Sequence, residues 1–253
     1  ISLEEMKFSN LVLNRLSFKN ENEGLVIIAG PPGSGKSSLI DAIVNHNNTH
    51  YSGSIFLIND SLEYYHESKN SVIRYQKVYR DVNSVTDALD RCLDYHPNMV
   101  VIEDITSPEL LDGALKLVDT GSLVFATMKN KSVTDVIYKL LALYPADSRD
   151  LIRRHLARTL AAVICVQLLP TTNEKMVSVK EILVANEQIS QIIYSGNIEE
   201  LYPIMQRNRK IGLQTMEQDL LGYIKTGQIA VEIAMEAANR AKLLKDLMQY
   251  ASS

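Results

Sequence analysis

The sequence has no tryptophan and only two cysteines, Cys92 and Cys165, among its 253 residues. Two cysteines cannot build the disulfide framework that stabilises small secreted domains, so we expect both to be buried, reduced thiols. No apolar run approaches the roughly eighteen residues that a membrane-spanning helix needs, and no charged leader followed by an apolar segment opens the chain. We therefore expect a cytoplasmic protein with no direct membrane insertion, which is peripheral to a membrane only through partners.

Neither sign of charge dominates, because 26 basic residues stand against 30 acidic ones and give a net charge of −4. A protein that grips nucleic acid needs a basic surface facing the phosphate backbone, so this composition argues against nucleic acid as a partner. Hydrophobic residues make up 46% of the chain. That content, at this length, predicts one large domain or a main domain with a helical annex.

The most informative segment is an apolar run, residues 25–29, that ends abruptly in a glycine-rich loop, residues 30–37. The loop has a glycine, four intervening residues and then Gly-Lys-Ser, which is typical of a phosphate-binding loop between a buried strand and a helix. The expected nucleotide-binding residues are Gly30, Pro32, Gly33, Ser34, Gly35, Lys36, Ser37 and Ser38. The alternative is a glycine-rich turn that binds no nucleotide.

Each residue type in this loop has a physical reason. Glycines let the backbone fold tightly, so that successive N–H groups and the next helix N-terminus face one anion. Lys36 has the length to reach the outer phosphates, and the Ser37 hydroxyl is a ligand for Mg²⁺. The loop therefore predicts ATP and Mg²⁺ as cofactors.

Two carboxylates are candidates for catalysis. Asp104 follows the apolar run of residues 99–102, so it is expected to emerge beside the phosphate loop and to hold Mg²⁺, with Glu103 as its neighbour. Glu63 follows another apolar run, residues 54–58, and is the candidate for orienting the attacking water. The alternative for all three is a solvated acidic residue at a strand end.

Apolar runs alternate with helical patterns along the first half of the chain. This order predicts an α/β fold with a mostly parallel sheet flanked by helices, and a helical carboxyl-terminal region. The expected strands are residues 25–29, 54–58, 72–79, 99–102 and 123–126, followed by a strand pair at 163–168 and 176–183. We also expect a helical lead-in over 3–16, a turn-rich connector over 45–53, helical character over 132–160 and a long amphipathic terminus over 228–250.

Several segments together resemble the secretion ATPase superfamily, and within it the type IV pilus retraction ATPases. Residues 30–37 are similar to the family's phosphate loop, residues 60–64 to its aspartate box, residues 97–104 to its Walker B segment and residues 120–128 to its histidine box. Residues 167–170, 181–183 and 212–216 resemble carboxyl-terminal landmarks of the family. Each piece is weak singly, but their order and separations make the resemblance specific.

The resemblance implies a RecA-like ATPase core over residues 24–185, preceded by a lead-in over 1–23 and followed by a helical subdomain over 186–253. It implies hexameric rings that hydrolyse ATP to remove pilin subunits at the inner membrane, where a platform protein is the partner. The zinc-binding cysteines of the pilus-extension branch have no counterpart here, which favours retraction. Because only about twenty residues precede the loop strand, we expect the family's amino-terminal domain to be absent from this chain.

The departures from the family pattern suggest a weakened catalyst. Ser122 and Lys129 stand where the family has two histidines that approach the phosphates, and Glu103-Asp104 replaces Gly-Glu. Shortening Glu to Asp withdraws the carboxylate, and roughly 1 Å of misplacement costs on the order of 100-fold in rate. Two alternatives therefore stay open: a nucleotide-binding regulatory or structural subunit of a pilus or secretion machine, and a metabolite kinase.

Overall fold

The structure, a computed structural model, describes residues 2–19, 22–59, 65–77 and 84–252. Its centre is a seven-stranded sheet in the order β3-β2-β4-β5-β1-β6-β7. All neighbouring pairs are parallel except β6 and β7, which form an antiparallel hairpin. The strands are β1 (Gly24–Ala29), β2 (Ser54–Asn59), β3 (Val72–Lys77), β4 (Met99–Asp104), β5 (Leu123–Met128), β6 (Leu160–Pro170) and β7 (Met176–Val184).

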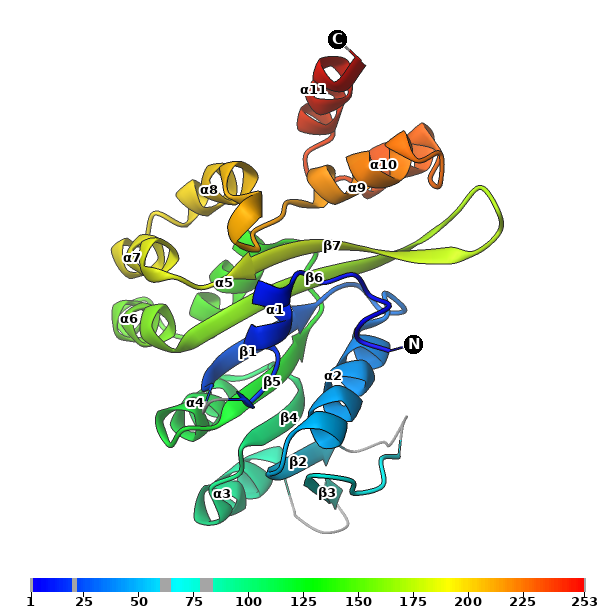
Figure 1. Cartoon of the computed structure of the whole chain (residues 1–253). Coiled ribbons are helices and arrows are strands. Elements are labelled where there is room, and N and C mark those ends of the chain that lie inside the picture. The colour runs from blue at the N-terminus through cyan, green and yellow to red at the C-terminus, as the bar shows by residue number, and fades with distance from the viewer. Residues whose placement is uncertain (1, 20–21, 60–64, 78–83, 253) are drawn as a thin grey trace.

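Helices cover both faces of this sheet (Figure 1). They are α1 (Asn10–Arg15), α2 (Lys36–His50), α3 (Val85–Tyr95), α4 (Pro108–Asp119), α5 (Val133–Ala142), α6 (Arg149–Thr159), α7 (Glu187–Ser195), α8 (Leu201–Arg207), α9 (Met216–Lys225), α10 (Val231–Ala237) and α11 (Ala241–Ser252). One buried apolar cluster joins the sheet to α3, α4, α5 and α6. A second cluster joins the opposite face to α2 and the amino-terminal segment. The predicted α/β architecture with a mostly parallel sheet is confirmed.

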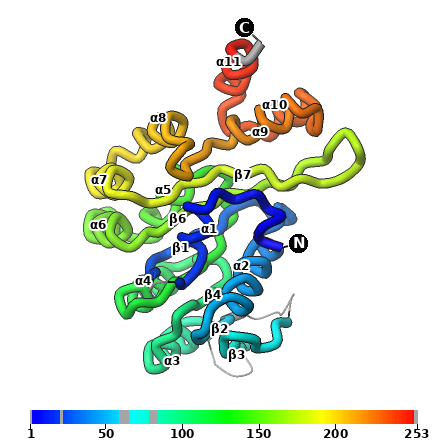
Figure 2. The backbone as a smooth tube through the Cα atoms, in the orientation of Figure 1, coloured from blue at the N-terminus to red at the C-terminus, as the bar shows by residue number. Residues whose placement is uncertain are grey.

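The carboxyl-terminal helices lie beyond β7, and α11 projects from the body of the molecule (Figure 2). A third apolar cluster holds them, in which Val179 of β7 packs with Met216 and Leu220 of α9 and with Leu244 of α11. Among the described residues, no helix has both the length and the apolar character to cross a membrane. Cys92 and Cys165 are buried and free, as expected.

The turn-rich connector expected over residues 45–53 is wrong for its first part, because α2 continues to His50. The asparagines that favoured a turn are instead buried and satisfied by backbone groups from other segments. Asn47 accepts a hydrogen bond from Phe18 N at 3.0 Å and donates to Leu16 O at 2.9 Å. Asn48 donates to Glu67 O at 2.8 Å. Tertiary contacts thus override the local preference of asparagine for turns.

The structure also refines three other expectations about helices. The lead-in is helical only from Asn10, where Ser9 caps α1, and turns precede it. The stretch over 132–160 is helical as expected and consists of two helices, because Pro145 follows the end of α5 and cannot continue it. The long terminus over 228–250 is divided into α10 and α11.

Candidate functional site

The glycine-rich loop joins the carboxyl end of β1 to the first turn of α2. β1 is buried along its whole length between β5 and β6, so the loop lies at the carboxyl edge of the sheet near its middle. Gly35 directly precedes α2 and adopts a left-handed conformation with φ 92°. The first N–H groups of a helix have no acceptor within it, so the start of α2 directs donors toward an anion in front of the loop.

Two glycines of the loop serve different purposes. A β-carbon on Gly30 would lie 2.4 Å from both Ser34 Oγ and Val166 O, so only glycine fits between the loop and β6. A β-carbon on Gly33 would meet no described atom within 4 Å, yet its φ of 75° favours glycine. Gly30 therefore allows close packing, whereas Gly33 allows the turn that faces the open side.

The polar side chains of the loop are suited to a phosphate. Lys36 Nζ donates to Gly30 O at 2.8 Å and to Pro31 O at 3.1 Å, so its ammonium already lies over the loop. The Ser34 hydroxyl is buried and has no hydrogen-bond partner among the described residues. A buried donor without a partner costs free energy that an arriving acceptor would recover. This arrangement fits a bound polyphosphate.

A cavity of about 400 Å³ opens beside the loop between α2 and the ends of β2, β4 and β5. Lys36, Ser37 and Asp104 all line it, as do Glu103 and Lys129. The structure thus brings three of the predicted site residues to one cavity. A hydroxyl and a carboxylate are oxygen ligands of the kind that Mg²⁺ prefers, so this pair fits the ion.

Asp104 is held on both sides by residues of the neighbouring strand and the loop after it. Lys129 Nζ lies 3.1 Å from Asp104 Oδ2, and Thr127 Oγ1 donates a hydrogen bond to Asp104 Oδ1. Lys129 therefore reaches the cavity, at a position where the family has a histidine. The sequence reasoning missed Thr127, although its position at the end of β5, two residues before Lys129, would have placed it near the same edge.

A second pair in this cavity was also missed. His66 Nε2 lies 3.0 Å from Asp41 Oδ1, and both residues line the cavity. Burial lowers the pKa of His66, the Asp41 carboxylate partly opposes this, and Lys69 lowers it further. Asp41 lies four residues after Ser37, one turn along the same face of α2, and that spacing is the signal that could have identified it.

Ser122 does not lie with the other predicted groups. It directly precedes β5 and is therefore at the amino edge of the sheet, whereas the loop is at the carboxyl edge. Its buried hydroxyl donates to Pro97 O at 2.7 Å. Ser122 therefore does not approach the loop, since a strand of six residues separates it from that edge. Glu63, with the rest of residues 60–64, lies outside the described residues.

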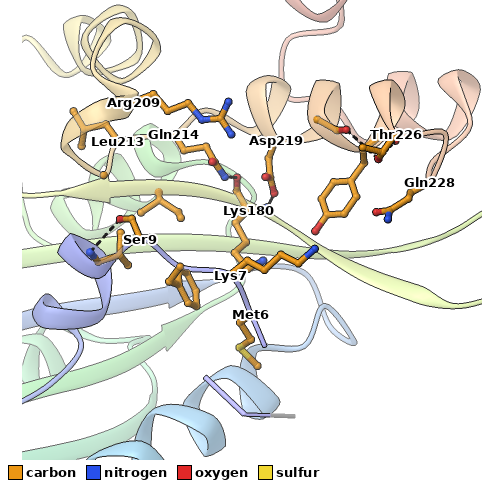
Figure 3. Close-up of a pocket in the computed structure, with 16 residues that line it drawn as sticks. Met6, Lys7, Ser9, Lys180, Arg209, Leu213, Gln214, Asp219, Thr226 and Gln228 are labelled. Carbon is orange, nitrogen blue, oxygen red and sulfur yellow. Dashed lines mark hydrogen bonds between the residues drawn. The ribbon is translucent and has the colours of Figure 1, made fainter. Parts of the chain in front are cut away.

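Another cavity, of about 450 Å³, lies under the amino-terminal segment against β7 and α9 (Figure 3). Lys7, Lys180 and Arg209 bring positive charge to it, and Asp219 brings negative charge. Burial lowers the pKa of Lys180, whereas Asp219 opposes that shift. Lys180 pairs with Val166, which packs in the apolar cluster formed with α2 and the amino-terminal segment, so this cavity opens on the face of the sheet that α2 covers.

Comparisons with known proteins agree with this geometry. A family model described as "Type II/IV secretion system protein" matches residues 3–241. The chain is 30% identical over 243 residues to a twitching motility protein of Neisseria gonorrhoeae. The match covers 96% of this chain and 64% of that relative. The chain is also 30% identical over 239 residues to the type IV pilus retraction ATPase PilT of Pseudomonas aeruginosa, which covers 94% of this chain and 68% of that relative.

The same relationship is visible in three dimensions. A crystal structure of the pilus retraction motor PilT with bound ADP superposes with a TM-score of 0.89 at 29% identity and covers 97% of this chain and 69% of that one. The chain thus spans about two thirds of the length of the relatives it matches. The RecA-like fold and the resemblance to retraction ATPases are confirmed. The chain belongs to the Type II/IV secretion system protein family and is a relative of the type IV pilus retraction ATPases.

Proposed function

We propose that this chain binds and hydrolyses Mg-ATP as the ATPase core of a type IV pilus retraction motor. The observation that carries the proposal is the convergence of Lys36, Ser37 and Asp104 on one cavity at the carboxyl edge of the sheet. Relatives with names that describe twitching motility and pilus retraction support the biological setting.

Residues of the loop would hold the phosphates, and Ser37 with Asp104 would hold Mg²⁺. The contacts to phosphate are assigned to the backbone and side chains of Gly30, Pro32, Gly33, Ser34, Gly35, Lys36, Ser37 and Ser38. Bound Mg²⁺ would neutralise charge on the outer phosphates during transfer to water. Lys129, now paired with Asp104, would add positive charge on the same side of the cavity. Glu63 keeps its proposed role of orienting the attacking water.

The nucleoside end of ATP is proposed to lie in the cavity under the amino-terminal segment. That cavity lies on the face of the sheet that α2 covers, and half-buried Tyr223 lines it together with Lys180. Replacing Tyr223→Ala should weaken ATP binding while leaving binding of inorganic tripolyphosphate unchanged, as measured by calorimetry. Equal weakening of both ligands would remove this cavity from the nucleotide site, and exposed Tyr194→Ala is the matched control.

The proposed oligomeric state rests on the relationship to the family and not on contacts within one chain. We propose a homo-oligomeric, hexameric ring that is cytoplasmic and meets an inner-membrane platform protein. Residues 24–185 would form the ATPase core and residues 186–253 the helical subdomain, which contains α7 to α11. The mass of the full-length protein, measured by light scattering with and without an ATP analogue, tests the ring.

Single-turnover hydrolysis tests the enzymatic part of the proposal. Lys36→Ala should weaken ATP binding at least about 100-fold, because it removes a charged partner of the outer phosphates. Glu63→Gln should retain ATP binding and lose turnover. ATP binding by the wild-type protein without any turnover would contradict the motor and point to a regulatory subunit. Unchanged affinity in Lys36→Ala would remove Lys36 from the site.

A further inference from the structure

A second group of ionisable residues lies between the sheet and the carboxyl-terminal helices, away from the phosphate loop. At its centre are two carboxylates, Glu181 of β7 and Glu217 of α9, with exposed fractions of 1% and 0%. Burying a carboxylate is costly unless several donors satisfy it. The hydrogen-bond donors of each carboxylate therefore show which segments that carboxylate holds together.

Glu181 joins the starts of two helices to the connection between two others. It accepts from Val133 N, the first residue of α5, at 2.7 Å, and from Met216 N, the first residue of α9, at 3.4 Å. It also accepts from Asn239 Nδ2 at 3.1 Å, and Asn239 lies between α10 and α11. One side chain thus accepts an N–H group at the start of each helix and ties the two helix starts together.

The start of α5 is one end of a short loop whose other end lies in the candidate nucleotide site. Lys129 at the first end is 3.1 Å from Asp104, and Val133 at the last end donates to Glu181. Between them, Lys131 O accepts from Asn239 Nδ2 at 3.4 Å. Residues 129–133 are thus in contact with the nucleotide cavity on one side and with the α10–α11 connection on the other.

Glu217 has the same degree of burial but different partners. It accepts from Arg240 N at 2.7 Å and from the Tyr202 hydroxyl, and the Arg240 guanidinium lies 3.5 Å from the centre of the Tyr202 ring. These partners belong to α8 and to the α10–α11 connection. Among the described residues, no hydrogen bond joins Glu217 to residues 129–133, which makes it a matched control.

We propose that Glu181 is a positioning residue that holds Lys129 at the nucleotide site through the start of α5 and links that site to the α10–α11 connection through Asn239. The inference rests on the proposed nucleotide site. When phosphates and Mg²⁺ engage Asp104 and Lys129, the loop 129–132 shifts, and its contact with Asn239 carries that shift to the carboxyl-terminal helices. Glu217 stabilises the same helices but does not link them to the nucleotide site.

Hydrogen–deuterium exchange of the full-length protein, with and without ADP and Mg²⁺, tests both the nucleotide site and its link to the α10–α11 connection. We expect nucleotide to protect peptides that span residues 25–40 and also to change exchange over residues 231–241. Glu181→Gln should keep the first effect and lose the second. Glu217→Gln should keep both, although exchange over 231–241 rises in both variants without nucleotide.

The outcomes separate the linkage from the proposed function. Protection of residues 25–40 in the wild type with no change over 231–241 would overturn the linkage and leave nucleotide binding intact. No protection of residues 25–40 would instead overturn the nucleotide site. Loss of the second effect in Glu217→Gln as well would remove the special role of Glu181.

A milder variant covers the case in which Glu181→Gln fails to fold. Asn239→Ala removes the contacts with Glu181 and Lys131 from a half-buried position outside any helix or strand. It should lose the nucleotide-dependent change over 231–241 and retain ATP affinity within about threefold. Turnover at saturating ATP should fall in Glu181→Gln by tenfold or more, since about 1 Å of misplacement costs on the order of 100-fold. Unchanged turnover and exchange in both variants would overturn the proposal.

Discussion

The phosphate loop depends on its backbone, whereas the buried carboxylate cluster of Glu181 and Glu217 depends on its side chains. In the loop, the shape comes from backbone that only glycine allows, as at Gly30, where a β-carbon would lie 2.4 Å from Val166 O. In the cluster, Glu181 and Glu217 lie in ordinary strand and helix backbone and act through their side chains. The loop is therefore vulnerable to added volume, whereas the cluster is vulnerable to changes in charge.

This difference also decides what each region leaves in the sequence. A backbone that needs glycine at fixed positions produces a spacing that is recognised without a structure. A lone glutamate in a strand has no such spacing, because its partners Val133, Met216 and Asn239 come from distant segments. Regions of the second kind are found only when the fold places their parts together.

The largest effect should come from adding one carbon to the loop. Gly30→Ala places a β-carbon against Ser34 Oγ and the Val166 carbonyl, at a φ of 153°. We expect a loss of about 4 kcal/mol in the free energy of unfolding, from overpacking together with backbone strain. Urea denaturation measures it, and ATP binding should disappear in the same variant.

Gly222→Ala is the control for that substitution. Gly222 lies in α9 with no described atom within 4 Å of its β-carbon position, so alanine should stabilise the protein by about 0.5–1 kcal/mol. If Gly30→Ala were equally harmless, the loop would not depend on its backbone, and the contrast between the two regions would fail.

The next effect concerns charge in the cluster. Burial raises the pKa of Glu181 to about 7, hydrogen bonds from Val133, Asn239 and Met216 oppose the shift, and Glu217 adds to it. A raised pKa means that the fold favours the protonated form of Glu181. The contribution of this protonated side chain to the free energy of unfolding is present at low pH and is lost as pH rises through about 7. Relative to Glu181→Gln, the wild type should lose about 2.5 kcal/mol between pH 5 and pH 8.

Urea denaturation of both proteins across that pH range measures the difference. A constant difference between wild type and Glu181→Gln from pH 5 to pH 8 would show that the carboxylate is no more difficult to ionise in the fold than in the unfolded chain. The cluster would then lose its distinguishing sensitivity to charge. Glu217→Gln, measured in parallel, shows how much of the slope belongs to the pair.

The smallest effect on stability is expected where the two regions meet. The Lys129 side chain is 67% exposed, so its ion pair with Asp104 is screened by water. Lys129→Ala should therefore change the free energy of unfolding by less than about 0.5 kcal/mol, while ATP turnover falls about tenfold. A stability loss above about 1 kcal/mol with unchanged turnover would make Lys129 a structural residue.

Much of the fold could be predicted from the sequence, because buried parallel strands are continuous apolar runs. The runs at 25–29, 54–58, 99–102 and 123–126 all lie in strands, and the expected pair after residue 160 is the β6–β7 hairpin. The errors fall where tertiary contacts decide, as with the buried asparagines that keep α2 helical to His50. Sequence patterns report local preference and not these distant partners.

The candidate site was predictable to the extent that a motif and a strand end define it. Lys36, Ser37 and Asp104 lie on one cavity because parallel strands bring their carboxyl ends to the same edge. Ser122 lies apart from this cavity because it directly precedes β5, at the edge of the sheet opposite the loop. The pair of Asp41 and His66 was missed because His66 comes from a segment without regular structure.

The position of the Lys36 ammonium has a consequence for the thermodynamics of binding. It already donates to the carbonyls of Gly30 and Pro31, so the ammonium is held over the loop before a phosphate arrives. The enthalpy of the new contact is then a difference between two hydrogen-bonded arrangements. Affinity would then arise mainly because the ordered loop loses little conformational entropy on binding, and less from the strength of any single lysine–phosphate bond.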